Sequence, residues 1–367
     1  MRPAFSSTKQ AAAFASLLIF LLSAPWLAGK RFLPPREQVY ASEGWNRGTY
    51  PWIQRQIFDE TNDIDIAFVG SSHIGWAIDT PYVQEKLDER LGRKAVVRSI
   101  SWSFAGLDAL FIITKDLLEH RHVRTLVFCD ETDKIYPGIG AKNWYRFGDD
   151  AAMTSGLEFR YRLFYYFADT IVMPRNLIEL LTPNLKEETN NSVPNYYEVH
   201  FHAPNPARRL GAAIVQMGYR EGGKVEPFVP YLPKTDVTSS DVYIYGPATV
   251  SQFKFADLAL PSWQIYLLRQ FALEAENHSC KLVLLHLPMK DQIGSSEITE
   301  AAYWPDVLGT DVAMLGIPTG RLFHGMSESE IKRMFANGKH LNQNGMKYFT
   351  PLIVPALFQL YEGKPHH

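Results

Sequence analysis

Cysteine is scarce in this chain of 367 residues, where only Cys129 and Cys280 occur. Two cysteines exclude a disulfide scaffold and a cysteine-rich zinc site. An excess of charge is lacking too, because 37 Lys and Arg residues face 39 Asp and Glu residues. Without a basic excess, nothing draws the whole chain to phosphate backbones, so we do not expect nucleic acid as a partner. The apolar share of 46% is typical of a folded globular chain.

Long apolar runs are also rare, and only one is long enough to cross a membrane. Residues 11–29, AAAFASLLIFLLSAPWLAG, lie between Lys9 and Lys30 and contain no charged side chain. At about 1.5 Å per residue, a helix of this length spans roughly 28 Å, which is enough for a hydrocarbon core. The sequence therefore predicts a single transmembrane helix near the N-terminus.

The same segment can be interpreted as a cleaved signal peptide, because basic residues precede the apolar run. Cleavage after Ala24 would place Leu22 where a small residue is required, and cleavage after Ala28 would place Trp26 there. We therefore expect an uncleaved signal-anchor, with residues 1–10 in the cytoplasm and the globular body outside it.

The rest of the chain divides into a linker and one large domain. Residues 30–62 contain a Pro-Pro pair and several glycines, which predicts a linker that ends in a short helix at 52–60. Residues 63–360 are expected to fold as a domain, with an insertion at about 138–260 that is rich in aromatic residues and proline. Strands are predicted at 63–70, 94–101, 125–131, 281–288 and 317–325, and helices at 81–92, 107–120, 262–278 and 346–361.

Strands that are apolar on both faces and alternate with helices indicate a parallel sheet covered on both sides. The predicted fold class is therefore α/β, with three layers. In such sheets, ligands and chemistry are found beyond the carboxyl ends of the strands.

Two serines follow the first predicted strand, in the segment GSSHIG at 70–75. A hydroxyl at this position has a tight turn beneath it and the backbone N–H groups of a helix start beside it. The alternative is that Ser71 or Ser72 only caps the helix, as serine often does. The segment lacks the G-x-S-x-G spacing, which argues against an α/β-hydrolase.

A histidine stands near the C-terminus, in the segment NGKHLNQNG at 337–345, just before the last predicted helix. A histidine on this loop can reach across the strand ends to a serine that follows the first strand. Most loop histidines are ordinary surface residues. Together with the serine turn, however, His340 becomes a candidate general base.

These segments resemble the SGNH, or GDSL, hydrolase superfamily, and more narrowly its membrane-anchored members such as the D-alanyl transfer protein and the alginate acetylation proteins. The resemblance covers about residues 63–135 and 262–360. It implies a flavodoxin-like parallel sheet of strand order 2-1-3-4-5 and no cofactor or metal. It also implies that Ser72 is the nucleophile, that His340 is the base, and that the backbone N–H groups of Ser72 and Gly106 bind the oxyanion.

The sequence departs from the family pattern at three places. Ser71 replaces the aspartate of G-D-S, and Asn337 replaces the aspartate that orients the histidine. The G-x-N-D block after the third strand is replaced by residues 129–133, CDETD, so one oxyanion donor is missing. A histidine oriented by an amide can still act as a base. The rival interpretation is a scaffold or polysaccharide-binding component that keeps the fold without the reaction.

Several other residues are candidates for binding roles. Asp130, Glu131 and Asp133 lie at the carboxyl end of the third predicted strand, where carboxylates can bind a metal, orient a sugar hydroxyl or form a solvated loop. Glu131 and His73 are candidates for substrate binding. His200 and His202 alternate as metal ligands do on a strand, but no third ligand stands at a suitable spacing. His286 is expected to be a core histidine. The aromatic segment at 161–167 is expected to pack in the core, with stacking on sugars or contact with a bilayer as alternatives.

The leading hypothesis is a membrane-anchored serine esterase or O-acyltransferase that acts outside the cytoplasm. Its expected partners are an acylated carbohydrate or an acyl donor of the cell envelope, the membrane, and a membrane acyltransferase. In this hypothesis Ser72 attacks the acyl group, His340 moves the proton, and Asn337 orients His340.

Overall fold

A computed structural model describes residues 5–28, 35–41, 53–102, 106–129, 144–181, 228–245, 260–290, 293 and 304–363. These residues form a mixed α/β structure built on one six-stranded sheet, whose strands lie in the order β2-β1-β3-β5-β6-β4. The strands are β1 (Ile64–Ser71), β2 (Val97–Trp102), β3 (Val123–Cys129), β4 (Tyr243–Tyr245), β5 (Lys281–Leu285) and β6 (Ala313–Gly316).

The sheet is parallel except at one edge, where β4 pairs with β6 in the antiparallel direction. This strand comes from the expected insertion and corrects the predicted five-strand order by adding a sixth strand beyond β6. The last parallel strand also differs from its prediction, since β6 ends at Gly316 and the segment predicted as a strand, 317–325, contains the short helix α14 between irregular residues and a turn.

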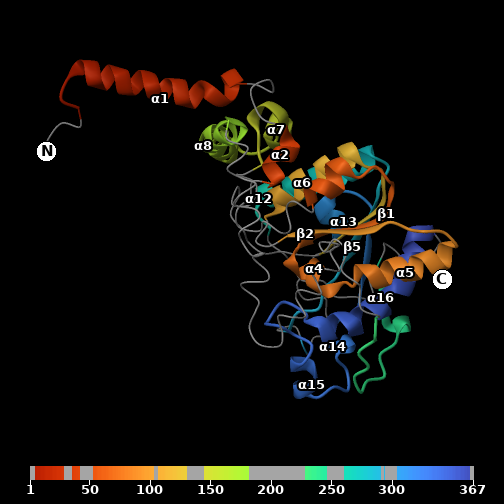
Figure 1. Cartoon of the computed structure of the whole chain (residues 1–367). Coiled ribbons are helices and arrows are strands. Elements are labelled where there is room, and N and C mark those ends of the chain that lie inside the picture. Colours follow the sequence, from red (N-terminus) through yellow and green to blue (C-terminus); the bar gives the residue numbers. More distant parts are fainter. Residues whose placement is uncertain are drawn as a thin grey trace.

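Helices cover both faces of the sheet (Figure 1). One face carries η2 (Arg55–Asp59), α6 (Leu107–His120), α7 (Phe147–Thr154), α8 (Phe159–Leu181), α12 (Ser262–Asn277) and α13 (Trp304–Leu308). The other face carries α4 (Ser72–Ala77), α5 (Thr80–Leu91), α14 (Thr319–Leu322), α15 (Glu328–Lys332) and α16 (Gln343–Glu362). A short 3-10 helix, η4 (Ser239–Asp241), precedes β4.

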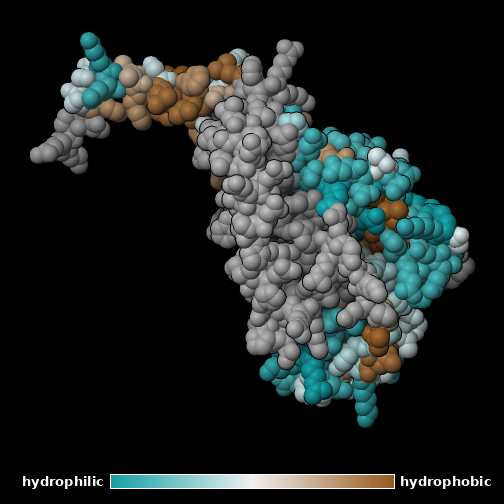
Figure 2. Space-filling view, in the orientation of Figure 1, coloured by the Kyte–Doolittle hydropathy of each residue, from teal (hydrophilic) through white to brown (hydrophobic). Residues whose placement is uncertain are grey.

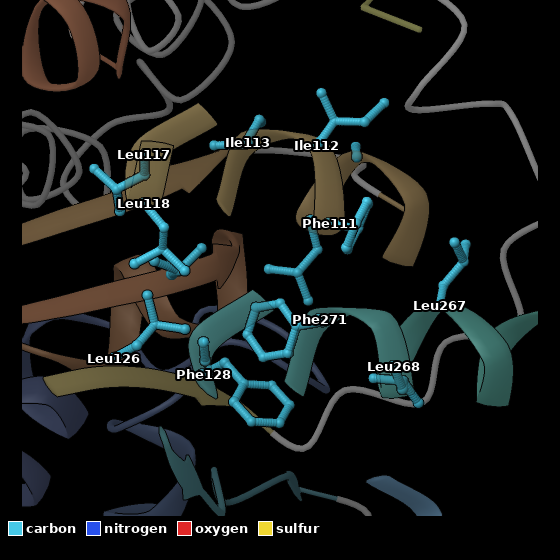
Figure 3. Packing of buried hydrophobic residues seen from close by; sticks show 14 of the residues in the cluster. Phe111, Ile112, Ile113, Leu117, Leu118, Leu126, Phe128, Leu267, Leu268 and Phe271 are labelled. Carbon is cyan, nitrogen blue, oxygen red and sulfur yellow. The ribbon is translucent and has the colours of Figure 1, made fainter. Parts of the chain in front are cut away.

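Each face has its own apolar core. Figure 3 shows the first, in which side chains of α6 and α12 meet those of β3. The rings of Phe128 on β3 and Phe271 on α12 lie 4.8 Å apart, edge to face. Burying one such side chain stabilises the fold by about 1.5–3 kcal/mol. The apolar faces of α6 and α12 therefore hold these helices on the sheet.

The helix α1 (Thr8–Ala28) extends away from the body (Figure 1). It is long and apolar enough to cross a membrane over Thr8–Leu27. Figure 2 shows the apolar side chains that run along it. Its last turns contact the body, and both Ala24 and Pro25 are buried there.

Part of the segment expected to be a linker is packed against the body. The helix α2 (Arg36–Ala41) places Arg36 beside two acidic side chains, Asp116 of α6 and Asp150 of α7, each at 2.7 Å. The buried Tyr40 also donates a hydrogen bond to Asp116, at 2.7 Å. Although burial opposes a charged side chain, Asp116 and Asp150 hold the pKa of Arg36 above its ordinary value.

Candidate active site

The serine turn lies at the carboxyl end of β1, the strand that pairs with both β2 and β3. Ser71 ends the strand and caps α4, because its hydroxyl accepts a hydrogen bond from the backbone N–H of His73 at 3.1 Å. Capping and catalysis were alternatives for these serines, and Ser71 takes the capping position. Ser72 is therefore the first residue of α4, with its side chain half-buried.

Close packing explains the glycine before these serines. A Cβ atom on Gly70 would lie 3.1 Å from Ile74 and 3.3 Å from the sulfur of Cys129. Both distances are tighter than ordinary van der Waals contact, so a side chain here would push the turn away from the end of β3. The glycine lets Ser72 follow the strand in a tight turn.

The loop that carries His340 lies between α15 and α16, and a short hairpin holds it. The backbone N–H of Ala336 donates to the carbonyl of His340 at 2.9 Å. Asn342 caps α16 by accepting from the backbone N–H groups of Asn344 and Gly345, while its amide donates to the carbonyl of Arg333 at 2.7 Å. One side chain therefore fixes both ends of the loop.

Gly345 begins α16 at a point where no side chain fits. A Cβ atom there would lie 2.3 Å from the carbonyl oxygen of Met334 and 2.8 Å from Leu341. The carbonyl belongs to the backbone of the same hairpin, so it cannot move without moving the histidine loop. The N-x-x-G spacing thus has a steric cause at this position.

Ser72 and His340 meet across the carboxyl edge of the sheet. The Oγ atom of Ser72 lies 2.9 Å from Nε2 of His340, although 268 positions separate them in the chain. The other ring nitrogen, Nδ1, lies 3.0 Å from Oδ1 of Asn337. The three residues singled out in the sequence therefore form one connected line of hydrogen bonds.

The backbone around Asn337 determines how the protons are arranged. The atom of Asn337 that faces His340 also lies 2.9 Å from the backbone N–H groups of Lys339 and His340. Because backbone N–H groups only donate, this atom has to be the amide oxygen. Nδ1 of His340 must then carry the proton that it donates to this oxygen. In the neutral ring, Nε2 is left to accept a proton from the hydroxyl of Ser72.

Two other side chains of α4 pack against the ring of His340. The ring of His73 lies edge to face at 4.5 Å, and the ring of Trp76 lies at 4.8 Å. His73 is buried, with 7% of its surface exposed, so it supports the ring rather than facing open solvent. Its role in substrate binding stays a prediction.

Gly106 lies at the start of α6, where it is the buried N-cap residue. It follows β2, and that strand pairs with β1 up to the positions of Trp102 and Ser71. Gly106 is thus on the neighbouring connection at the same edge of the sheet, as the resemblance implied. Its role as an oxyanion donor stays a prediction.

No protein-family model matches this sequence, and no curated protein is similar enough to count as a relative. The chemistry of the site is therefore inferred from its geometry.

Several residues weighed in the sequence lie outside the described residues: Glu131 with its neighbours Asp130 and Asp133, and the pair His200 and His202. His286 is described and is buried directly after β5, as expected for a core histidine. Within the described ranges, no group of three His, Cys, Asp or Glu side chains could hold a metal ion.

Sequence reasoning missed two residues that shape the site. Trp76 stands three positions after His73 on α4, and this i, i+3 spacing places both rings on one side of the helix. Asn342 stands before the last helix, where asparagine is a preferred cap. The helix spacing of Trp76 and the capping preference of Asn342 could be recognised in the sequence. Only the fold shows that Trp76 packs against His340 and that Asn342 holds its loop.

Proposed function

We propose that this protein is a membrane-anchored serine esterase or O-acyltransferase of the SGNH type. One observation carries the proposal: the half-buried hydroxyl of Ser72 lies within hydrogen-bond distance of Nε2 of His340, while Nδ1 of the same ring lies within hydrogen-bond distance of Asn337. This is the arrangement that a serine nucleophile requires of its base.

In the proposed reaction, the Oγ atom of Ser72 attacks the carbonyl carbon of an acyl ester while its proton passes to Nε2 of His340. The resulting tetrahedral intermediate collapses, and His340 returns the proton to the leaving alcohol. The acyl group remains on Ser72. A water molecule or a second hydroxyl, activated in turn by His340, then attacks the acyl-serine and releases it as an acid or as a new ester.

Two features support the finer parts of the proposal. The parallel strands lie in the order β2-β1-β3-β5-β6, which fits a flavodoxin-like domain with an added edge strand. The backbone N–H groups of Ser72 and Gly106 follow adjacent strands, so they are the natural donors to a developing oxyanion.

The helix α1 is long and apolar enough to cross a membrane, and this supports an envelope substrate. With the body outside the cytoplasm, the substrate class is an acylated carbohydrate of the envelope or of an exported polysaccharide. A membrane acyltransferase would be the source of the acyl group, and the proposed reaction needs no cofactor.

A second candidate function is a scaffold or carbohydrate-binding component without activity. The observation that favours it is Asn337 itself, because an amide gives an imidazolium less stabilisation than a carboxylate does. In serine protease triads, the change from aspartate to asparagine lowers turnover by about 10⁴-fold. The scaffold is therefore the outcome to exclude first.

A fluorophosphonate probe distinguishes the two functions, since it labels serines that are activated as nucleophiles. We expect labelling of the detergent-solubilised full chain, loss of labelling in Ser72→Ala, and retained labelling in Ser71→Ala. The Ser71 variant is the matched control because its hydroxyl caps α4 and is the neighbouring serine in the chain. Labelling that is absent from the unmodified chain, or equal in Ser72→Ala, would establish the scaffold.

A further inference from the structure

The helix α8 contacts α1 within the apolar segment. The hydroxyl of Tyr166 on α8 donates a hydrogen bond to the carbonyl of Leu22 on α1. Leu22 lies five positions before Leu27, where the segment able to span a membrane ends. At about 1.5 Å per residue, the contact is roughly 7.5 Å inside that end of the span. Tyr166 is therefore at the depth where headgroups give way to acyl chains, about 5–10 Å below the surface.

The same helix exposes an apolar stripe. Phe159, Leu163 and Phe167 are spaced by four residues and have 72%, 36% and 47% of their surfaces exposed. Residues four apart lie on one side of a helix, so the three side chains form one row. The opposite side of α8 faces the body, where Tyr165 is buried and donates to Asp108 at 2.8 Å. The exposed row thus contributes nothing to the apolar core of the body.

Charged residues flank this row. Arg160 and Arg162 are both exposed, and the guanidinium of Arg160 lies 4.6 Å from the ring centre of Tyr161. Helices that lie in a membrane surface combine an apolar row at the acyl boundary with basic side chains at the headgroups. Aromatic residues are also enriched at the boundary between headgroups and acyl chains. Trp26, next to the end of the candidate span at Leu27, has 69% of its surface exposed.

We infer that the row Phe159, Leu163 and Phe167 docks the body onto the bilayer that α1 crosses. The bilayer is the occupant because α1 and α8 are already in contact, so inserting α1 brings the row to the lipid boundary. The axis of α8 then lies in the membrane surface, and Arg160 and Arg162 reach the phosphates of the headgroups. This inference depends on α1 as a span and not on the reaction at Ser72.

Nitroxide labels on the full chain in proteoliposomes test the inference. A single cysteine replaces Phe167 in a background where the two buried native cysteines are alanine. The vesicles contain phosphatidylcholine and phosphatidylglycerol. Leu273 on α12 is the matched control, since its exposed fraction of 46% is close to that of Phe167.

Oxygen concentrates in acyl chains, whereas a nickel chelate stays in water. We expect the label at Phe167 to be several-fold more accessible to oxygen than to nickel, and the label at Leu273 to show the reverse. Equal nickel accessibility at both sites would overturn the inference by showing that the row faces water. Protection from both reagents would overturn it in favour of a second protein copy on the row. Near-ultraviolet circular dichroism checks that F167C is folded like the unmodified chain. If it is not, L163C is used instead, with the same expected result.

Discussion

The helices on the two faces of the sheet differ in what they are attached to. On one face, α6, α7 and α8 contact α1 and α2, so this face, called the anchoring face below, joins the body to the apolar helix α1. On the other face, α4 and α16 carry the serine turn and the end of the histidine loop. In Figure 1, α2 lies with α6 on one side of the sheet, and α4 and α16 lie on the other side.

The difference teaches how each face tolerates change. The anchoring face depends on buried charge, because Arg36 is held between two acidic side chains with little access to water. The site face depends on steric fit and on hydrogen bonds to the backbone, as at Gly345 and Asn342. Substitutions at Arg36 should change stability alone, and substitutions at Ser72 or Asn337 should change rate.

The largest expected effect is on rate. Ser72→Ala should lower ester cleavage by about 10⁴-fold or more, because the proposed reaction uses no other nucleophile. The melting temperature should stay within a degree or two, since the hydroxyl is only half-buried. Hydrolysis of p-nitrophenyl acetate by the full chain in detergent measures the rate. Unchanged hydrolysis in the variant would place the chemistry elsewhere.

The largest expected effect on stability is on the opposite face. Arg36→Met should lower the free energy of unfolding by about 3–5 kcal/mol, because it removes the arginine that the buried carboxylates of Asp116 and Asp150 share. Denaturant unfolding measures the loss, and the rate of ester cleavage by the folded fraction should not change. The matched control is Arg160→Met, which removes the arginine of an ion pair with Glu158 in which both side chains are exposed. That loss should be about 1 kcal/mol or less.

A smaller effect on the site face should depend on pH. Burial raises the pKa of Asp79 to about 6 from an ordinary 3.8, although the backbone N–H of Tyr82 opposes the shift. Because the folded pKa is the higher one, the folded state prefers protonated Asp79, and stability is lost as pH rises through 6. Asp79→Asn keeps an oxygen for the N–H of Tyr82 and carries no charge.

The Asp79→Asn variant should therefore match the unmodified chain near pH 4 and exceed it at pH 8, by at most about 3 kcal/mol. Urea unfolding at the two pH values provides the comparison. A stability difference that is the same at both would show that the charge of Asp79 does not matter.

The smallest expected effect concerns the orienting residue. Asn337→Asp gives the imidazolium a negative partner while keeping an oxygen for the two backbone N–H groups. The rate of ester cleavage should rise at least about tenfold, a partial recovery of the loss that the opposite change causes in proteases. The same rates are measured in Ser72→Ala and in the double variant, so four chains are compared in all. Equal low rates in all four would support the scaffold.

The sequence was informative where local pattern and tertiary structure agree. The first three strands are apolar segments rich in residues that favour strands. The helix α6 begins and ends at the predicted residues, 107 and 120. The link between Ser72 and His340 came from two short segments at strand and helix ends. Such segments can be recognised because turns and helix caps favour particular residue types at fixed positions.

Other features could not be predicted because their cause is tertiary. The strand β6 contains Gly316, where a Cβ atom would lie 2.6 Å from Cβ of His286 on the neighbouring connection. The strand β4 has only three residues and exists through its pairing with β6. The tautomer of His340 depends on backbone groups of its own loop, which the residue types do not reveal.

The distance in sequence between Ser72 and His340 has a consequence for the timing of biogenesis. The strands β1, β2 and β3 all lie before residue 130, so this half of the sheet can assemble while the rest of the chain is still being made. The base, however, comes 268 residues after the nucleophile. At about 5–20 residues per second, it emerges roughly 13–54 s later. During that interval the nascent protein contains Ser72 without His340, so the proposed serine–histidine pair can form only after residue 340 has been made.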